Sequence, residues 1–161
     1  MPFSSDEFRK ILGHFATGVT VVTARLDSGK PWGFTVNAFT SVSLTPPLIL
    51  VCVGNAGGSF EIMSKVERFA VNFLAEDQEQ VSRVFASRVE DRFEGVPYEP
   101  GANGAPLIEG CLGYIECRKT ASHVAGDHTI LIGEVTAGEA SGGHPLLFYA
   151  SAYGRMSKSS E

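Results

Sequence analysis

Apolar and polar residues alternate along positions 34–44, and this is the clearest pattern in the chain. The apolar positions are Phe34, Val36, Ala38, Val42 and Leu44, and the polar positions between them are Thr35, Asn37, Thr40, Ser41 and Ser43. A period of two predicts a half-exposed β-strand, with core residues on one side and hydroxyls and an amide on the other. The polar side suits an anionic planar ligand, although an ordinary exposed strand face is the more common explanation.

Residues 48–53 form an unbroken apolar run, LILVCV, shortly after that segment. A continuous run of branched and small apolar residues predicts a strand that is buried on both faces. Pro46 and Pro47 precede the run and lack backbone donors. We therefore expect a stiff connection there, outside any central ladder.

The N-terminal segment has the features of a capped amphipathic helix. Ser4 followed by Glu7 forms a capping box, and apolar residues then recur at helical spacing at Phe8, Ile11, Leu12 and Phe15. We expect Gly13 to weaken this helix and Gly18 to end it. The β-branched residues 19–24 and the turn that follows predict a hairpin with a strand at residues 32–38.

Two further helices are expected. Residues 54–58 are rich in glycine and predict a turn, after which Ser59 caps a helix that ends at Val66. Because the first turn of a helix presents free N–H groups and a positive dipole end, this start favours a phosphate. A strand at residues 69–74 precedes the other helix, which is capped by Asp77 and Gln80.

The second of these helices has one apolar and one basic face. Val81, Val84 and Phe85 are expected to face the core, while Arg83 and Arg88 project outward. Arg83 is a further candidate for binding a phosphate. A solvated helix charge is nevertheless the more common role of such an arginine.

The C-terminal half combines a long irregular segment with several strands. Residues 91–106 contain many glycines and prolines and predict a loop without structure of its own. Strands are expected at 111–121 and 129–137, joined by a polar link that could bring His123 or His128 to the rim of a pocket. A strand at 145–149 closes the sheet, and residues 156–161 form a frayed tail. Many short strands with few helices predict a β-dominated barrel in one domain spanning residues 1–161.

Composition and charge narrow the classes of function. The 161 residues are 43% hydrophobic and 19% charged, as in ordinary globular domains, and carry a formal charge of −5. An acidic chain disfavours nucleic acid and anionic membranes as partners, and no apolar run approaches the ~20 residues that cross a bilayer. The N-terminus lacks the pattern of a secretory signal, and three cysteines, Cys52, Cys111 and Cys117, favour reduced thiols. We therefore expect a cytoplasmic protein.

Familiar catalytic motifs are missing from the sequence. The histidines show neither H-E-x-x-H nor close Cys/His spacing, so no metal site is expected. A G-x-S-x-G elbow that would activate a serine is also missing. Hydride transfer needs few catalytic side chains when a flavin carries the chemistry, because the protein then holds the reactants and tunes their charge.

The segment G-F-T-V-N-A-F-T-S-V-S-L-T-P-P-L-I-L-V-C-V, at residues 33–53, closely resembles the defining segment of the short-chain flavin reductases. The similarity continues at residues 15–23, 69–78, 82–86, 91–93, 125–135 and 145–149. The resemblance implies a mainly β Greek-key split barrel of the FMN-binding type with a few short helices. It also implies an NAD(P)H:flavin oxidoreductase that reduces FMN or FAD for a partner flavin-dependent monooxygenase, and a homodimer with its flavin sites near the subunit interface.

The same resemblance implies a set of flavin contacts. Those to the isoalloxazine ring come from a continuous segment and from a second strand along the ring edge: Thr35, Val36, Asn37 and Ala38, then Cys52, Val53 and Gly54. Those to the ribityl and phosphate groups come from Ser41 and Ser43, with Ser59 and Arg83 as further phosphate candidates.

The remaining implied residues lie near the nicotinamide or over the cofactors. His128 resembles the residue beside the nicotinamide, with Asp127 orienting it. Phe93 and Tyr153 are aromatic candidates for covering the cofactors, although plain packing explains Phe93 equally well.

Two other functions remain open on the sequence. One is a split-barrel flavoprotein oxidase acting on a small substrate, and the other is a flavin-binding or storage protein without fast turnover. The sequence does not separate FMN from FAD. NADH is favoured over NADPH because the acidic chain shows no basic pair that would hold a 2′-phosphate.

Overall fold

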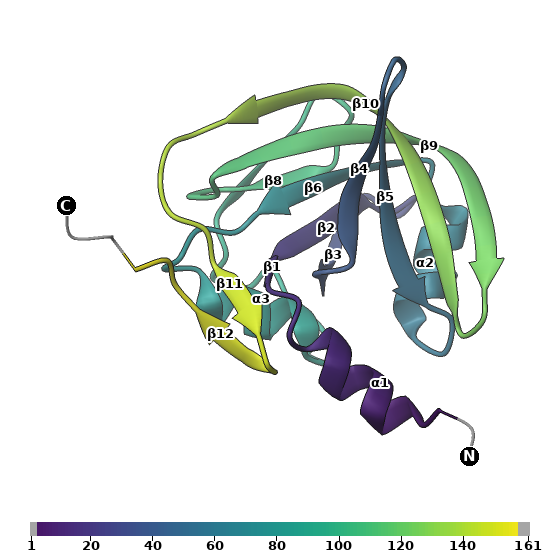
Figure 1. The fold of residues 1–161 in the computed structure, drawn as a ribbon. Helices are drawn as coiled ribbons and strands as arrows, with labels where there is room; N and C mark the ends of the chain where they lie inside the picture. The colour runs from purple at the N-terminus through teal and green to yellow at the C-terminus, as the bar shows by residue number, and fades with distance from the viewer. Residues whose placement is uncertain (1–2, 158–161) are drawn as a thin grey trace.

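Strands supply most of the secondary structure in the computed structural model, which describes residues 3–157 (Figure 1). The helices are α1 (Ser5–Leu12), α2 (Gly58–Lys65) and α3 (Glu79–Ala86). The strands of the first half are β1 (Thr17–Gly18), β2 (Thr20–Arg25), β3 (Pro31–Val36), β4 (Phe39–Leu44), β5 (Pro47–Gly54) and β6 (Arg68–Phe73). Those of the second half are β7 (Tyr98–Pro100), β8 (Pro106–Ile108), β9 (Gly113–Ala125), β10 (His128–Ala140), β11 (Leu147–Tyr149) and β12 (Ala152–Gly154).

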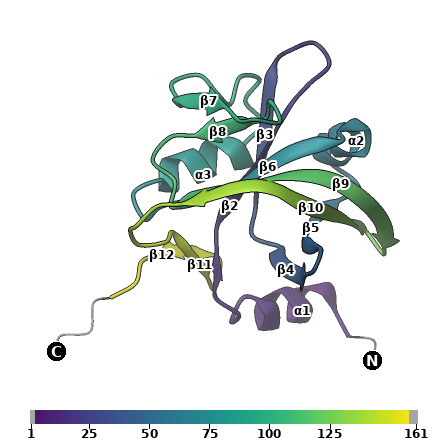
Figure 2. The same cartoon turned by 90° about the horizontal axis from the view of Figure 1, so that it is seen from above.

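The main sheet is antiparallel throughout, and its seven strands lie in the order β3-β2-β6-β9-β10-β5-β4. Its two edge strands, β3 and β4, are consecutive in the chain and are joined by only two residues, Asn37 and Ala38. Because two residues span only about 7 Å, the sheet must curl until its edges meet, as Figures 1 and 2 show. Within residues 3–157 no ladder pairs β3 with β4, so the barrel is split along this seam. The predicted mainly β split barrel is confirmed.

The barrel interior is filled by alternate residues of its strands. Its largest cluster includes Val22, Val51, Val53, Phe69, Val71 and Leu131. A second cluster lies beneath α3 and includes Val21, Leu74, Phe85, Phe93 and Leu146. Gly33 on β3 makes this packing possible, since a Cβ there would lie 2.9 Å from the Phe85 ring.

The segment 34–53 differs from the sequence prediction in two ways. The alternating residues 34–44 form two strands instead of one, because the chain turns across the seam at Asn37 and Ala38. β5 is buried on one face only: Ile49, Val51 and Val53 face the core, whereas the residues between them are half-buried. Pro47 is the first residue of β5, where a missing donor costs least, and Pro46 lies in the turn before it.

Residues 91–106 are not a structureless loop, because β7 lies within them and pairs with β8. Side chains of the barrel hold this hairpin in place. The Thr23 hydroxyl donates to the Pro106 carbonyl over 2.6 Å, and the Ile108 amide donates to Asn72 Oδ1 over 2.9 Å. These bonds reach across the sequence, so local composition could not reveal them.

The β9–β10 hairpin is longer than predicted, and its turn consists of only Gly126 and Asp127. Gly126 takes a positive φ of 65°, which allows so tight a turn. The predicted polar link begins at residue 122, yet residues 122–125 belong to β9, where His123 pairs with Ile130. The predicted strand at 145–149 does not close the barrel. Instead β11 pairs with β1 and β12 in a separate sheet.

The helix ends confirm one cap and correct two. The capping box of α1 is present, and the helix ends at Gly13 instead of Gly18. The N-cap of α2 is Gly57 instead of Ser59, and that of α3 is Gln78 instead of Asp77. The predicted hairpin of β2 with β3 is confirmed. Residues 158–161 of the predicted tail lie outside the described residues.

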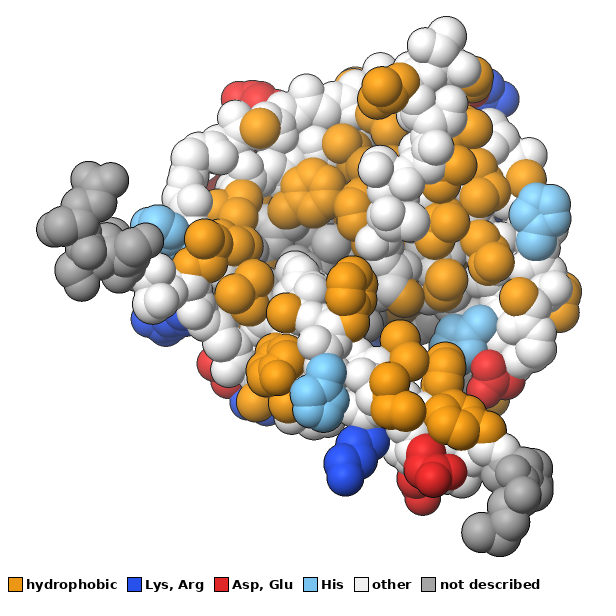
Figure 3. All heavy atoms as spheres, viewed as in Figure 1, with side chains coloured by type: hydrophobic (Ala, Val, Ile, Leu, Met, Phe, Trp, Pro, Cys, Tyr) orange, Lys and Arg blue, Asp and Glu red, His pale blue; other side chains and the backbone are white. Residues whose placement is uncertain are grey.

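Helix α1 lies on the opposite side of the molecule from α3 and the β7–β8 hairpin (Figure 2). Its apolar residues Phe8, Ile11 and Leu12, with Phe15 just beyond, are all exposed, and none of its residues is buried. Figure 3 shows hydrophobic side chains gathered over this helix and over the strands above it. Among residues 3–157, no helix has the length and hydropathy that a membrane span requires.

Candidate functional site

A cavity of about 450 Å³ opens at the seam of the barrel. Four separate segments line it: the end of β3 with the link to β4, the end of β5, the start of α2 and the turn between β9 and β10. The lining residues are Phe34, Thr35, Val36, Asn37, Ala38, Cys52, Val53, Gly54, Ala56, Gly57, Ser59, Asp127 and His128. The topology brings these segments together because β5 lies between β4 and β10 in the sheet.

Most of the sequence-predicted site residues meet in this cavity. The structure brings together Thr35, Val36, Asn37, Ala38, Cys52, Val53, Gly54, Ser59 and His128. The link is fixed at the cavity wall, since the Ala38 carbonyl accepts a hydrogen bond from the Cys52 amide over 3.0 Å. Phe34, Ala56 and Gly57 also line the cavity and were not predicted, although each is a close neighbour in sequence of a residue that was.

The start of α2 brings the N-terminal end of a helix to the cavity. Its N-cap, Gly57, has no side chain that could occupy the first-turn N–H groups, and a Cβ added at Gly58 would meet no atom within 4 Å. Open space in front of a helix N-terminus suits a phosphate, because the free N–H groups and the helix dipole both favour negative charge. Ser59 adds a hydroxyl at the same place.

His128 is the first residue of β10 and pairs with Gly54 at the end of β5. Its Nδ1 lies 2.7 Å from Asp127 Oδ1, and this hydrogen bond, with the charge of the ring, lowers the pKa of the Asp127 carboxyl. The other ring nitrogen, Nε2, lies over Gly54, where an added Cβ would be 3.7 Å away. Asp127 therefore fixes one side of the ring and leaves the Nε2 side toward the cavity.

The cysteines offer no nucleophile. Burial raises the pKa of the Cys52 thiol in the cavity wall, so this side chain is neutral near pH 7 and serves as a small apolar surface. Burial also raises the pKa of Cys111 and Cys117 to about 12. Among residues 3–157, moreover, no group of three His, Cys, Asp or Glu side chains could hold a metal ion.

Arg83 and Tyr153 lie beside the cavity and do not line it. The Arg83 guanidinium stacks over the Tyr153 ring at 4.8 Å from its centroid and bonds Glu79 on the same helix. The Tyr153 hydroxyl lies 2.7 Å from the hydroxyl of Ser82, whose carbonyl accepts a hydrogen bond from Thr35 over 2.7 Å. Ser82 thus connects this pair to the cavity wall, a role that the sequence did not indicate.

Three predicted residues are placed elsewhere. Ser41 and Ser43 lie on β4, where the register with β5 shifts between them, and neither lines the cavity. Phe93 packs in the core beneath α3, with its ring centroid 4.9 Å from that of Phe85 and 4.8 Å from that of Tyr98. Phe93 is therefore a core residue, as expected if it serves packing and does not cover a cofactor.

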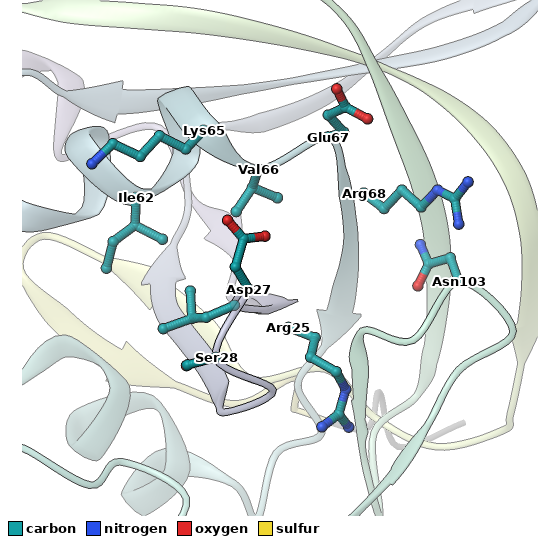
Figure 4. A pocket seen from close by; sticks show the side chains of 10 residues that line it. Arg25, Asp27, Ser28, Ile62, Lys65, Val66, Glu67, Arg68 and Asn103 are labelled. Carbon is teal, nitrogen blue, oxygen red and sulfur yellow. The ribbon is translucent and has the colours of Figure 1, made fainter.

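A larger cavity, of about 660 Å³, lies near the far end of α2 (Figure 4). Its walls carry charges of both signs: Arg25, Lys65 and Arg68 with Asp27 and Glu67. Arg25 is already bonded to the carbonyls of Gly104 and Gly29. A planar apolar ring would have to displace water from these charges without replacing their hydrogen bonds, which is costly. The seam cavity is smaller but has the apolar and hydroxyl walls that such a ring needs.

Known proteins resemble this chain over nearly its whole length. The family described as "Flavin reductase like domain" matches residues 12–157. The FMN reductase (NADH) SmoA of Agrobacterium fabrum (strain C58 / ATCC 33970) is 43% identical over 155 residues, which cover 96% of this chain and 88% of that protein. The flavin-dependent monooxygenase reductase subunit HsaB of Mycobacterium tuberculosis (strain ATCC 25618 / H37Rv) is 40% identical over 149 residues, covering 91% and 79% of the two chains.

The fold is also that of a solved oxidoreductase. The NADH:FAD oxidoreductase SgcE6 of Streptomyces globisporus C-1027, solved in complex with NAD and FAD fragments, matches with a TM-score of 0.93 and 37% identity. The match covers 100% of this chain and 98% of that chain. The chain spans about half of one Rhizobium meliloti (strain 1021) relative, 49% of its length at 47% identity. It spans 66% of the stachydrine N-demethylase reductase subunit Stc3 of the same organism, at 42% identity.

Proposed function

Because the chain belongs to the flavin reductase-like domain family, we propose that it is an NAD(P)H-dependent flavin reductase. It would take a hydride from a nicotinamide cofactor and pass it to FMN or FAD. The observation that carries the proposal is the seam cavity, which gathers residues from four segments: three that the resemblance assigned to the flavin and one, with His128, that it assigned to the nicotinamide.

The residues that line the cavity support flavin binding. The link residues Asn37 and Ala38 would lie beside the ring, and Gly54, which has no side chain, lets a planar group approach the backbone closely. Ser59 and the start of α2 would hold the phosphate. A bound flavin supplies the hydride-accepting chemistry, so the protein needs only to bind, orient and shield the two cofactors.

His128 would place the nicotinamide. Its Nδ1 is occupied by Asp127, so the ring can offer Nε2 and its face to a second ligand above Gly54. None of the residues that line the cavity is Lys or Arg, which supports NADH over NADPH because a 2′-phosphate needs a cation.

The reduced flavin would serve a partner monooxygenase. HsaB is named as the reductase subunit of a flavin-dependent monooxygenase, and Stc3 as the reductase subunit of a demethylase. The cysteines of the chain form no disulfide, which supports a location in a reducing compartment such as the cytoplasm.

The protein would work as a homodimer, and α1 supports this. Phe8 and Ile11 are more than half exposed, and Phe15 is 74% exposed. An eight-residue helix is marginal in water without packing, and an apolar patch of this kind is typical of an interface. A second copy of the chain is the occupant that the family resemblance implies.

The test is NADH oxidation with added FMN or FAD. The protein should oxidise NADH only when a flavin is present, and it should bind oxidised flavin in a titration followed by flavin fluorescence. A protein that binds flavin but leaves NADH unchanged would be a binding or storage protein. An oxidase would need its own organic substrate, and absence of binding to either flavin would end the assignment.

His128→Ala should lower turnover or raise KM for NADH while the flavin Kd stays nearly constant, because the flavin contacts lie on other segments. His123→Ala is the matched control, since His123 is an exposed histidine of the same hairpin outside the cavity. Parallel losses of melting temperature, flavin affinity and NADH kinetics in His128→Ala would instead show that His128 only stabilises the turn.

A further inference from the structure

Asn55 bridges two of the segments that form the seam cavity, although it does not line the cavity itself. It follows Gly54 at the end of β5 and makes three hydrogen bonds to the tip of the β9–β10 hairpin. Its amide N–H donates to the Asp127 carbonyl over 2.9 Å, and its Nδ2 donates to the Gly126 carbonyl over 3.4 Å. Its Oδ1 accepts from the Thr129 hydroxyl over 2.7 Å.

These bonds hold the chain on both sides of His128. Asp127 precedes the histidine and Thr129 follows it, and each is bonded to Asn55. Thr129 is only 2% exposed, so its hydroxyl has little access to water and depends on Asn55 for a partner. The backbone of His128 is therefore fixed relative to the end of β5, where the flavin edge is expected.

We propose that Asn55 is a positioning residue for hydride transfer, which holds the His128 ring at the distance from the flavin that the nicotinamide requires. This inference rests on the proposed function, because it assigns Asn55 a role in the same site. Without the Asn55 side chain, the hairpin tip would keep its ladder with β5 and the backbone bond to Asp127, but it would lose the side-chain bonds to Gly126 and Thr129. Small displacements of a positioning group cost rate more than binding.

The experiment is a double-mutant cycle between Asn55 and His128 with NADH kinetics, flavin Kd and melting temperature measured on each protein. Asn55→Ala should lower kcat/KM for NADH by about five-fold or more, with the flavin Kd changed by less than about two-fold. In a His128→Ala background the same substitution should change kcat/KM by less than about two-fold, because nothing remains to be positioned.

Conservative and control variants separate positioning from folding. Thr129→Val should reproduce the kinetic loss, whereas Thr129→Ser should retain most of the activity, because it keeps the hydroxyl that donates to Asn55 Oδ1. Thr136→Val is the matched control, since Thr136 on β10 also donates through its hydroxyl, to the Glu116 carbonyl, but far from the tip. It should leave NADH kinetics unchanged.

Several outcomes would overturn the inference. Equal effects of Asn55→Ala in the two backgrounds would show that Asn55 acts independently of His128. Normal NADH kinetics of Asn55→Ala would show that Asn55 positions nothing that the reaction needs. If the unmodified protein is active, normal NADH kinetics of His128→Ala would also overturn the inference, because His128 would then have no role for Asn55 to support. Failure of the proposed function is distinguishable, because then the unmodified protein would not oxidise NADH with either flavin.

Discussion

Helices α1 and α3 have the same length and a similar division into apolar and polar faces, yet they are stabilised in opposite ways. α1 has a complete capping box and buries none of its residues. Among the described residues, no side chain caps α3 at its N-cap, Gln78. The helix nevertheless buries Ser82 and Phe85. An amphipathic pattern thus predicts that the apolar face of a helix packs against another protein surface. Only the fold shows whether that surface belongs to the same chain.

The largest effect on stability should come from removing Phe85, the side chain by which α3 packs into the core. Phe85 is 1% exposed and packs edge-on against Phe93, so Phe85→Ala leaves a cavity in the core. We expect the free energy of unfolding to fall by about 3 to 5 kcal/mol. Urea denaturation should show a lower midpoint with an unchanged m-value. A loss below about 1 kcal/mol would mean that α3 does not anchor this part of the core.

The corresponding change in α1 should affect assembly instead of the fold. Phe8→Glu places a charge in the exposed apolar face and should weaken the proposed dimer by roughly 2 to 3 kcal/mol, or about 30- to 150-fold in its Kd. Sedimentation equilibrium measures this shift, with Lys10→Ala on the same helix as the control. If Phe8→Glu and the unmodified protein have the same mass at all concentrations, α1 is not the dimer contact.

The outer face of α3 offers a third test. Arg83 is stacked on Tyr153 beside the cavity, so Arg83→Ala should weaken flavin binding by about 1 to 3 kcal/mol, the range for a lost charge-assisted hydrogen bond. Arg88→Ala is the control, because Arg88 is exposed just beyond the end of the same helix. An unchanged flavin Kd in Arg83→Ala would show that Arg83 contacts only Glu79 and Tyr153 and not the flavin.

The smallest effect is expected at the cap of α1. The Ser4 hydroxyl accepts from the Glu7 amide over 3.2 Å, and Ser4→Ala should destabilise the helix by about 1 kcal/mol. Because α1 buries nothing within its own chain, this loss should appear mainly as weaker dimerisation. Sedimentation and far-ultraviolet circular dichroism together would measure it, and unchanged values in both would contradict the link between cap and assembly.

The same cap should make assembly sensitive to acid. Hydrogen bonds from Ser4 lower the pKa of Glu7 below its usual value, so the carboxylate stabilises the folded helix. A lowered pKa gives stability that is complete above the ordinary carboxyl range and is lost as the pH falls through the folded value. Ser4→Ala should flatten this dependence of dimer mass on acid pH.

Local patterns in the sequence predicted the elements that are stabilised locally. The capping box of α1 and the β2–β3 hairpin followed from neighbouring residues, and the whole segment 33–53 identified the fold through its resemblance. The β7–β8 hairpin was missed because its bonds to Thr23 and Asn72 come from distant parts of the chain. The helix caps at Gly57 and Gln78 were missed because neither side chain makes the cap.

The residues of the candidate site also divide into those that local motifs predicted and those that depend on distant contacts. Residues assigned from continuous motifs, such as those at 35–38 and 52–54, meet in one cavity. Ser41 and Ser43 do not line this cavity. The chain crosses the seam before them, so they lie on β4, the edge strand on the other side of the seam from β3. Ser82 and Asn55 act through hydrogen bonds to other segments, and a polar residue of that kind has no signature in a single sequence.

The two-residue link at the seam makes chain length itself a determinant of this site. Most surface loops absorb an inserted residue at little cost, but Asn37 and Ala38 join two strands whose partners are both fixed. One extra residue would either bulge out of the link into the cavity or slip a strand, and a slip of one position turns every side chain of that strand to the other face. Substitutions in the link are therefore easier for the barrel to accommodate than insertions, so we expect residue identity at Asn37 and Ala38 to vary more readily than the length of the link.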